Sequence, residues 1–413
     1  MTTPDLLSSR LADPAEVIER LGPWNREVRA QFPILTGHPD RAYLDSSATA
    51  QKPQAVIDAV NRYLCTINAN AGRGTYTWAN ATTDIVEAAR GRVARFLGDT
   101  GSDGSGVTFT SGTSGGLRRI ALDWLTTHLR DGDHIIAPFA DHQANLLPWT
   151  EAIESLASRG IRVAIDALPY ESTGTGDYDI EALRRLLTPR TTFVAATHVH
   201  HVYGNDMNVH RLRDAVGPDV VICLDAAQSV GHLPIDVGAL DVDFVVFSGH
   251  KAMALPGIGA IWARNRRGHV FAPNGWSGTP NTSGIVSLCA ALDWLDAAGV
   301  DRIHEWTLAL GALLTDALSS MDAYEVLGCQ SSLRLDSPVQ RRVGIVTFRH
   351  RDISSNDLGF ILDSRGLMVR ADGHCQGRDG EKTASVRASV HAYTSADEVR
   401  RLIEVLGELE NAR

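Results

Sequence analysis

Residues 220–251 read VVICLDAAQSVGHLPIDVGALDVDFVVFSGHK, and this stretch decides the fold. It holds two short apolar runs, at 220–224 and 243–247, of the kind that form strands buried on both faces. The first run delivers Asp225, and the second leads through Ser-Gly-His to Lys251. Ligands of open α/β sheets bind at the carboxyl ends of the strands. The stretch therefore predicts a functional site where these two strands end.

The same alternation of apolar runs and helical patterns extends over the centre of the chain. Further strand-like runs lie at 106–110, 134–138, 162–166, 192–196 and 257–263. Helix-like segments between them lie at 114–129, 145–157, 180–187 and 209–216. Strands that are apolar on both faces and separated by helices predict an α/β fold with a mostly parallel central sheet.

The pattern changes after this sheet. Helical stretches at 285–298 and 303–320 lead into spaced strands at 344–348, 367–370 and 385–391, and a last helix at 395–409. This order predicts a smaller α+β lobe at the C-terminus. We expect three parts: an N-terminal segment at 1–32 that packs with the small domain, a large domain at 33–283 and a small domain at 284–413.

Composition excludes several classes of function. A net charge of −10 without a basic run argues against a nucleic-acid partner. No run approaches the length of a membrane span, and the N-terminus lacks the pattern of a secretory signal. The five scattered cysteines have no CxxC spacing and are typical of a reducing compartment. We therefore expect a cytoplasmic protein.

Asp225 and Lys251 suit one type of cofactor chemistry. A lysine amine forms an imine with an aldehyde cofactor, and a carboxylate keeps a pyridine nitrogen protonated so that the ring accepts electrons. The competing interpretation is an ion pair at the edge of the sheet, and the two residues alone do not decide between them.

Two further strand ends favour the cofactor. The strand at 107–110 runs into Ser-Gly-Thr-Ser-Gly-Gly at 111–116 and then a helix, which leaves backbone N–H groups free to hold a phosphate. The strand at 135–137 leads to His142, whose imidazole suits stacking on a flat ring. Four suitable strand ends together indicate a cofactor site.

Segments spread over nearly the whole chain resemble the class V aminotransferase family of pyridoxal-phosphate (PLP) enzymes, most closely its cysteine desulfurase and selenocysteine lyase branch. The Ser-Gly-His-Lys motif with an upstream Asp-x-Ala-Gln is specific for this family, and the Arg-x-x-x-x-Cys element is typical of the desulfurase branch. The resemblance implies the fold type I, aspartate aminotransferase-like PLP-dependent transferase fold. The resembling stretches are AYLDSSATAQKP at 42–53, DHQANLLPW at 141–149, THV at 197–199, LDAAQ at 224–228, FSGHK at 247–251, GTPN at 278–281, VRADGHC at 369–375 and RAS at 387–389.

The resemblance also implies a role for each matching residue around the cofactor. Lys251 forms the Schiff base with PLP and moves protons. Asp225 partners the pyridinium nitrogen, and Gln228 approaches the ring hydroxyl. His142 stacks on the ring and acts as an acid or base. The phosphate is held by Thr113, Ser114, Ser248 and His250, with Thr279 reaching it from the second subunit of a homodimer.

The same resemblance implies a substrate and a reaction. Arg370 and Arg387 bind the substrate carboxylate, and the fork of Arg suits this geometry better than Lys. Cys375 takes sulfur from cysteine as a persulfide, or cleaves the corresponding C–Se bond, and leaves alanine. A thiolate is needed for that attack, so an accessible loop position is expected. A sulfur-acceptor protein is then a further partner.

Several positions depart from the family pattern. His200-His201 follow Thr-His-Val where Ser-Asn is usual, so His201 takes the place of the Asn near the ring oxygen and the substrate. Gly115 replaces a usual Glu, the segment at 266–278 is short, and the loop after Cys375 reads QGRDGEK. These departures bear on the substrate more than on the cofactor.

Other interpretations of the sequence remain. The main alternative is a PLP enzyme that transaminates, epimerises or eliminates from another amino acid, with Cys375 incidental, and a scaffold that keeps the cofactor without turnover is a third. Gly-Thr-Ser-Gly-Gly at 112–116 matches the nucleophile elbow of hydrolases, but a hydrolase leaves Asp225 and Lys251 without a purpose.

Two side-chain groups invite a role that we do not assign to them. His198 and His200 would share one face of a strand, yet no cysteine or carboxylate cluster accompanies them, so we expect no metal site. Cys223 and Cys289 fall on apolar stretches and are expected to be buried structural residues.

Overall fold

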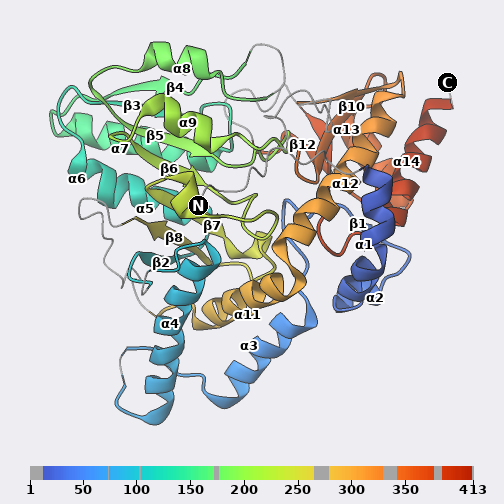
Figure 1. Cartoon of the computed structure of the whole chain (residues 1–413), viewed down its shortest axis with the longest axis horizontal. Coiled ribbons are helices and arrows are strands. Elements are labelled where there is room, and N and C mark those ends of the chain that lie inside the picture. The colour runs from blue at the N-terminus through green and yellow to red at the C-terminus, as the bar shows by residue number, and fades with distance from the viewer. Residues whose placement is uncertain are drawn as a thin grey trace, which may run out of the picture.

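The computed structural model of the protein describes residues 13–72, 74–101, 104–171, 176–264, 279–328, 342–375 and 384–411. A seven-stranded sheet forms the centre of the larger part, with the strand order β2-β8-β7-β6-β5-β3-β4 (Figure 1). Its strands β3 to β7 run parallel, and β8 pairs antiparallel with both β2 and β7. This confirms the predicted α/β fold with a mostly parallel sheet. The bounds are β2 Val107–Thr110, β3 His134–Ala137, β4 Ala164–Ala167, β5 Thr191–Thr197, β6 Val221–Asp225, β7 Phe244–Ser248 and β8 Gly259–Ala263.

The central strands are apolar throughout because each of their faces is covered by helices. In β6, Ile222 and Leu224 belong to one hydrophobic core and Cys223 to another. The core that contains Cys223 also takes its residues from the helices that follow β2 and β3. Successive side chains of a strand point to opposite faces, so a strand between two cores has no polar face.

The helix expected at 114–129 is continuous but changes its winding. It consists of α5 Thr113–Arg119, the π-helical turn η1 Ile120–Leu125 and α6 Thr126–His128. The other predicted helices of this part form within two or three residues of their expected ends. They are α7 Leu147–Ser158, α8 Ile180–Leu186 and α9 Val209–Val216. This part also contains three short helices, η2 Gln143–Asn145, α10 Val237–Leu240 and η3 Gly249–Lys251.

Helices before the first sheet strand were not predicted from the sequence. α3 Gln54–Thr66 and α4 Thr77–Phe96 pack against α11 Thr282–Ala298 and project from the sheet (Figure 1). α1 Pro14–Arg29 packs on α12 Val300–Ser319, and the short α2 Pro33–Thr36 follows it.

The smaller part is built on a four-stranded antiparallel sheet with the order β12-β13-β10-β9. Val17 and Leu21 of α1 join its core, whereas Ile285 and Leu288 of α11 join the core of the large sheet. The boundaries 1–32, 33–283 and 284–413 stay a prediction. The elements are β9 Tyr324–Val326, β10 Ile345–His350, β12 Arg370–Asp372, β13 Ser385–Ser389, α13 Ser355–Ser364 and α14 Ala396–Asn411.

One expected strand is divided in the structure. The run at 367–370 forms β11 Leu367–Met368, which pairs in parallel with β1 Ala42–Tyr43, and then β12, which pairs with β13. The single strand predicted there was wrong because its two halves bond to different partners. Among the described residues, no single helix has the length and apolar composition of a membrane span; α11 and α12 pass that test only as a pair, bent by 76°.

Candidate active site

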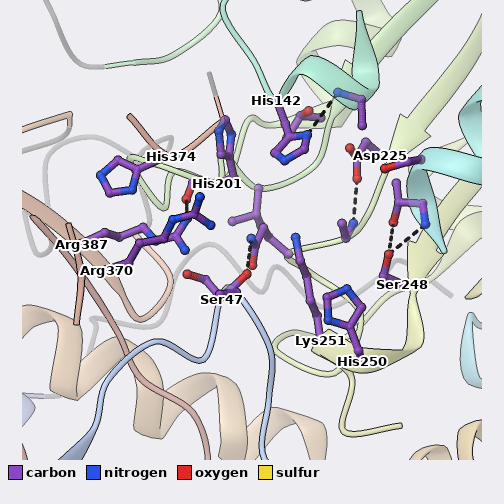
Figure 2. A pocket seen from close by; sticks show the side chains of 18 residues that line it. Ser47, His142, His201, Asp225, Ser248, His250, Lys251, Arg370, His374 and Arg387 are labelled. Carbon is purple, nitrogen blue, oxygen red and sulfur yellow. Dashed lines mark hydrogen bonds between the residues drawn. The ribbon is translucent and has the colours of Figure 1, made fainter. Parts of the chain in front are cut away.

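A pocket lies where β2, β3, β5, β6 and β7 end, and Arg370 and Arg387 of the smaller part close it (Figure 2). Figure 2 shows Arg370 and Arg387 on one side, Asp225 and Ser248 on the other, and Lys251 between them. The lining residues are Ser47, Ala48, Thr113, Ser114, His142, Ala144, Thr197, Val199, His201, Asp225, Ala227, Gln228, Ser248, His250, Lys251, Arg370, His374 and Arg387.

Lys251 and Asp225 lie together because they follow neighbouring parallel strands. In the register of these strands, Asp225 of β6 lies opposite Val246 of β7. Burial lowers the pKa of Lys251 to about 8, although the Asp225 carboxylate raises it. Burial also raises the pKa of Asp225, against the hydrogen bond from the Ala227 backbone N–H at 2.9 Å and the charge of Lys251. Neither side chain is a freely solvated charge, as it would be in a surface ion pair.

The ring of His142 is held in one orientation at the pocket wall. Its Nδ1 accepts the Ala144 backbone N–H at 3.1 Å, so the proton of the neutral ring sits on Nε2. Burial and then the charges of Lys251, Arg370 and Arg387 lower the pKa of His142 to about 4. The imidazole is therefore neutral at neutral pH and suited to stacking on a ring.

The end of the pocket formed by Thr113 and Ser248, next to Gly112, is lined by small and hydroxyl-bearing residues. Ser248 Oγ accepts the backbone N–H of Thr113 at 2.8 Å and lies 2.8 Å from Thr113 Oγ1. A Cβ added at Gly112, whose φ is +143°, would lie only 3.2 Å from Ser248 Oγ. The N-terminal start of α5 thus presents N–H and O–H groups, the donor set that holds a phosphate.

Arg387 is fixed by two contacts that link distant parts of the chain. Its terminal nitrogens donate to the His201 carbonyl at 2.9 Å and to Asp45 Oδ1 at 3.3 Å. The side chain is 2% exposed, and its Nε has no partner among the described residues. The Arg387 guanidinium is therefore held in one position at the pocket wall, where it can bind a carboxylate.

Arg370 links the pocket to Cys375. One of its terminal nitrogens donates to Cys375 Sγ at 3.2 Å. His374 and Cys375 both have positive φ values, 55° and 58°, and form a tight left-handed turn after β12. The Cys375 carbonyl accepts the backbone N–H of Gln143 at 3.2 Å, which joins this turn to the His142 loop. Cys375 is exposed, as expected for a nucleophile.

His201 is a buried imidazole whose two ring nitrogens have no partner among the described residues. Its ring lies 5.0 Å from that of His200 and 5.1 Å from that of His142, measured between centroids. Burial, then His200 and His142, hold the pKa of His201 well below its usual value. The residue that replaces the family Asn is thus neutral and keeps a donor and an acceptor for a ligand.

The structure brings together eleven of the thirteen residues predicted for the site. Thr279 is exposed and is not among the lining residues, so its action from a second subunit stays a prediction. Cys375 lies outside the lining and reaches it through Arg370. No role was predicted for His374, Asp372 or Asp45 from the sequence, although all three lie in stretches quoted for the resemblance.

His198 and His200 do not share a strand face, because β5 ends at Thr197. His200 Nδ1 accepts the backbone N–H groups of Val202 and Tyr203, and its Nε2 lies 3.5 Å from Asp141. Within the described ranges, no group of three or more His, Cys, Asp or Glu is placed to hold a metal ion.

The prediction that Cys223 and Cys289 are buried is confirmed for the first and holds only partly for the second. Cys223 is buried and Cys289 half-buried, and burial raises the pKa of both thiols. Neither is therefore poised as a thiolate. The loop at 376–383 and the whole segment at 266–278, where departures from the family were noted, lie outside the described residues.

The residues of the pocket fit PLP. Both His201 ring nitrogens and Gln228 Oε1 belong to lining residues and are buried without a hydrogen-bond partner in the part of the chain that the structure describes, so they are free to bind a ligand. Lys251 supplies an amine for an aldehyde, Asp225 a carboxylate for a pyridine nitrogen, and the Gly112 end a seat for a phosphate. Gln228 Nε2 donates to the Ser47 carbonyl at 2.9 Å, which fixes its amide in the lining.

Comparison with known proteins agrees with this geometry. The model of the aminotransferase class-V family matches residues 42–402. The probable cysteine desulfurase of Vibrio cholerae is 33% identical over 417 aligned positions, which cover 92% of this chain and 96% of that protein. The cysteine desulfurase of Cronobacter sakazakii is 32% identical, with 92% of this chain and 96% of that protein covered.

Solved structures of cysteine desulfurases also resemble this chain over most of its length. The apo cysteine desulfurase of Thermococcus onnurineus has a TM-score of 0.82 at 26% identity, and covers 94% of this chain and 98% of its own. The Escherichia coli cysteine desulfurase CsdA, in its S-sulfonic acid form, has a TM-score of 0.76 at 27% identity over 93% and 98% of the two chains.

Proposed function

The chain belongs to the aminotransferase class-V family of PLP-dependent enzymes, and from that premise we propose that it is a cysteine desulfurase. It takes the sulfur of L-cysteine onto Cys375 as a persulfide and leaves alanine. The observation that carries this proposal is the Arg370–Cys375 contact of 3.2 Å, which joins an exposed thiol to the pocket that fits the cofactor. The names of the relatives support the same reaction.

PLP would be held by Lys251, Asp225, His142 and the donors at the N-terminal start of α5. When bound, it supplies an electron-accepting ring that lets an amino acid lose its α-proton and accept electrons from a breaking bond. The chemistry that follows is set by the side chains around the substrate.

Lys251 and Cys375 carry out the proposed steps. The amine of Lys251, once released by the incoming amino group, takes the proton from the substrate Cα. The Cys375 thiolate then attacks the substrate sulfur, so that an S–S bond forms, the Cβ–S bond breaks and its electron pair stays with the carbon skeleton. One proton added at Cβ and one returned to Cα complete alanine; they balance the proton that Lys251 took from Cα and the proton that the Cys375 thiol lost on becoming a thiolate.

Arg387 and Arg370 would orient the substrate by its carboxylate, and His201, which lines the pocket, would contact the ring oxygen of PLP and the substrate. A homodimer in which Thr279 completes the partner's phosphate site, a protein that accepts the sulfur, and a cytoplasmic location are parts of the same proposal. Analytical ultracentrifugation tests the dimer directly.

The reaction is tested by one released product and one covalent modification of the protein. With L-cysteine, the holoenzyme is expected to form alanine and, on Cys375, a persulfide detected as one added sulfur by mass spectrometry. Cys375→Ser should abolish both while the visible absorbance of the bound cofactor stays, and Lys251→Ala should abolish that lysine-dependent absorbance. If Cys375→Ser still forms alanine at the parental rate, the thiol is incidental and another PLP reaction must be sought.

A further inference from the structure

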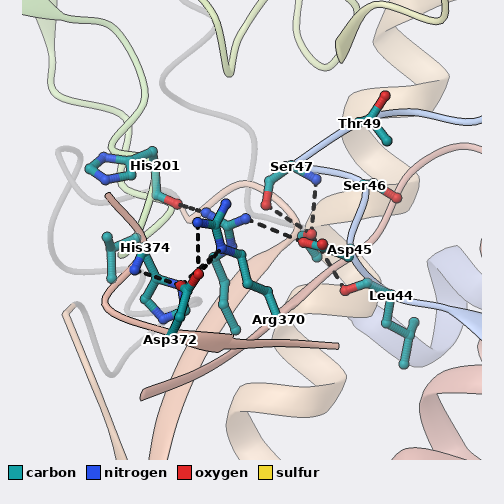
Figure 3. Close-up of polar contacts among 12 residues, drawn as sticks. Leu44, Asp45, Ser46, Ser47, Thr49, His201, Arg370, Asp372 and His374 are labelled. Carbon is teal, nitrogen blue, oxygen red and sulfur yellow. Dashed lines mark hydrogen bonds and ion pairs between the residues drawn. The ribbon is translucent and has the colours of Figure 1, made fainter. Parts of the chain in front are cut away.

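Arg370 already binds a carboxylate of the protein itself (Figure 3). Its Nε donates to both oxygens of Asp372 at 2.9 Å, and one terminal nitrogen lies 2.8 Å from Asp372 Oδ2. Side-on contact through Nε and a terminal nitrogen is one of the two fork geometries with which Arg holds a carboxylate ligand. Asp372 therefore sits on an edge of the guanidinium that a substrate carboxylate would use.

The Asp372 carboxylate is anchored on its other side to the turn that carries Cys375. Asp372 Oδ1 accepts the backbone N–H of His374 at 2.6 Å and lies 3.0 Å from His374 Nδ1. Partial burial raises the pKa of Asp372, but the hydrogen bonds from Arg370 and from the His374 backbone outweigh it and lower the pKa overall. The carboxylate is thus ionised and held in place at neutral pH.

The two arginines of the pocket differ in how firmly they are held. Arg387 is buried, at 2% side-chain exposure, whereas Arg370 is 25% and Asp372 48% exposed. An ion pair that is partly open to water is weak and is readily exchanged for another carboxylate. A substrate carboxylate can therefore replace Asp372 as the partner of Arg370.

We propose that Asp372 determines the affinity of this site for carboxylate substrates, because it occupies Arg370 in the free enzyme and competes with the substrate for the same N–H groups. The terminal nitrogen that contacts Asp372 also donates to Cys375 Sγ. The inference rests on the proposed function, in which Arg370 receives the substrate carboxylate.

The test measures binding of a ligand without sulfur to the holoenzyme. L-Alanine carries the carboxylate and L-alaninamide lacks it, and each is titrated through the change in absorbance of the bound cofactor. Asp372→Asn and Asp372→Ser remove the charge but keep an oxygen for the His374 N–H group. We expect either variant to lower the Kd of L-alanine about three- to tenfold, the range of a partly exposed charged pair, and to leave that of L-alaninamide unchanged.

Two further variants keep this inference separate from the proposed function. Asp397→Asn breaks an exposed ion pair with Arg400 on α14, at 2.8 Å, and should change neither Kd. Arg370→Ala should weaken L-alanine binding; if it does not, the proposed role of Arg370 is wrong. If Arg370→Ala weakens binding while both Asp372 variants bind L-alanine no more tightly than the parent, the inference alone is overturned. A distorted turn would not make the Asp372 variants bind L-alanine more tightly while leaving the Kd of L-alaninamide unchanged.

Discussion

Partial burial among the strand ends lowers the pKa of the Lys251 amine from its ordinary value of 10.5 to about 8. Only a neutral amine attacks the aldehyde of PLP. At pH 8 about half of such an amine is neutral, against about 0.3% for a lysine with a pKa of 10.5, so the neutral fraction is raised by roughly 160-fold. The rate at which the apoprotein takes up PLP should therefore be half-maximal near pH 8.

The assay follows the cofactor absorbance after mixing apoprotein with PLP between pH 6 and 10. Nα-Acetyl-lysine with the same PLP solutions is the control, since the titration of PLP itself then cancels in the ratio of the two rates. Asp225→Asn removes the largest charge that raises the pKa of Lys251, so its profile should shift below pH 8. A wild-type profile that rises in parallel with that of Nα-acetyl-lysine up to pH 10 would refute the reasoning.

Three other outcomes test the site and its support. Ser248→Ala removes the acceptor of the Thr113 N–H bond, so the PLP affinity should fall about tenfold in equilibrium dialysis, and an unchanged affinity would contradict the phosphate cradle. Arg387→Met leaves Asp45 largely buried without its cation and should cost about 2–3 kcal/mol of unfolding free energy in urea, part of which Asp45→Asn in the same chain restores. His142 in the apoprotein should titrate near pH 4 by NMR and stay neutral between pH 5 and 8, with His142→Gln assigning the signal; a midpoint near 6.5 would show that the ring is solvated.

Much of the fold was readable because the signals were local. The runs at 220–224 and 243–247 became β6 and β7 almost residue for residue, since strands covered on both faces are apolar throughout. α3 and α4 were missed, and their buried residues face α11, which lies some two hundred residues further along the chain. The run at 367–370 was expected as one strand, because nothing in four residues shows that its halves bond to different partners.

For the candidate site too, part of the arrangement was predictable from the sequence and part was not. Asp225, Lys251 and the Gly112 loop follow strands of one sheet, and the carboxyl ends of parallel strands meet at one edge, so their proximity was predictable. The resemblance placed Arg370, Arg387 and Cys375 near them without showing what each contacts.

By itself, then, the sequence determined the α/β sheet, the place of Lys251 and Asp225 at its edge, and the cofactor that they suit. Only the tertiary structure decided that Arg387 is held by Asp45, that Asp372 occupies Arg370, and that Cys375 shares that guanidinium. Periodicity and turn residues encode local backbone geometry, which a short window of sequence reveals. A contact between side chains as far apart as Asp45 and Arg387 depends on how two separately formed cores pack, and no local pattern records it.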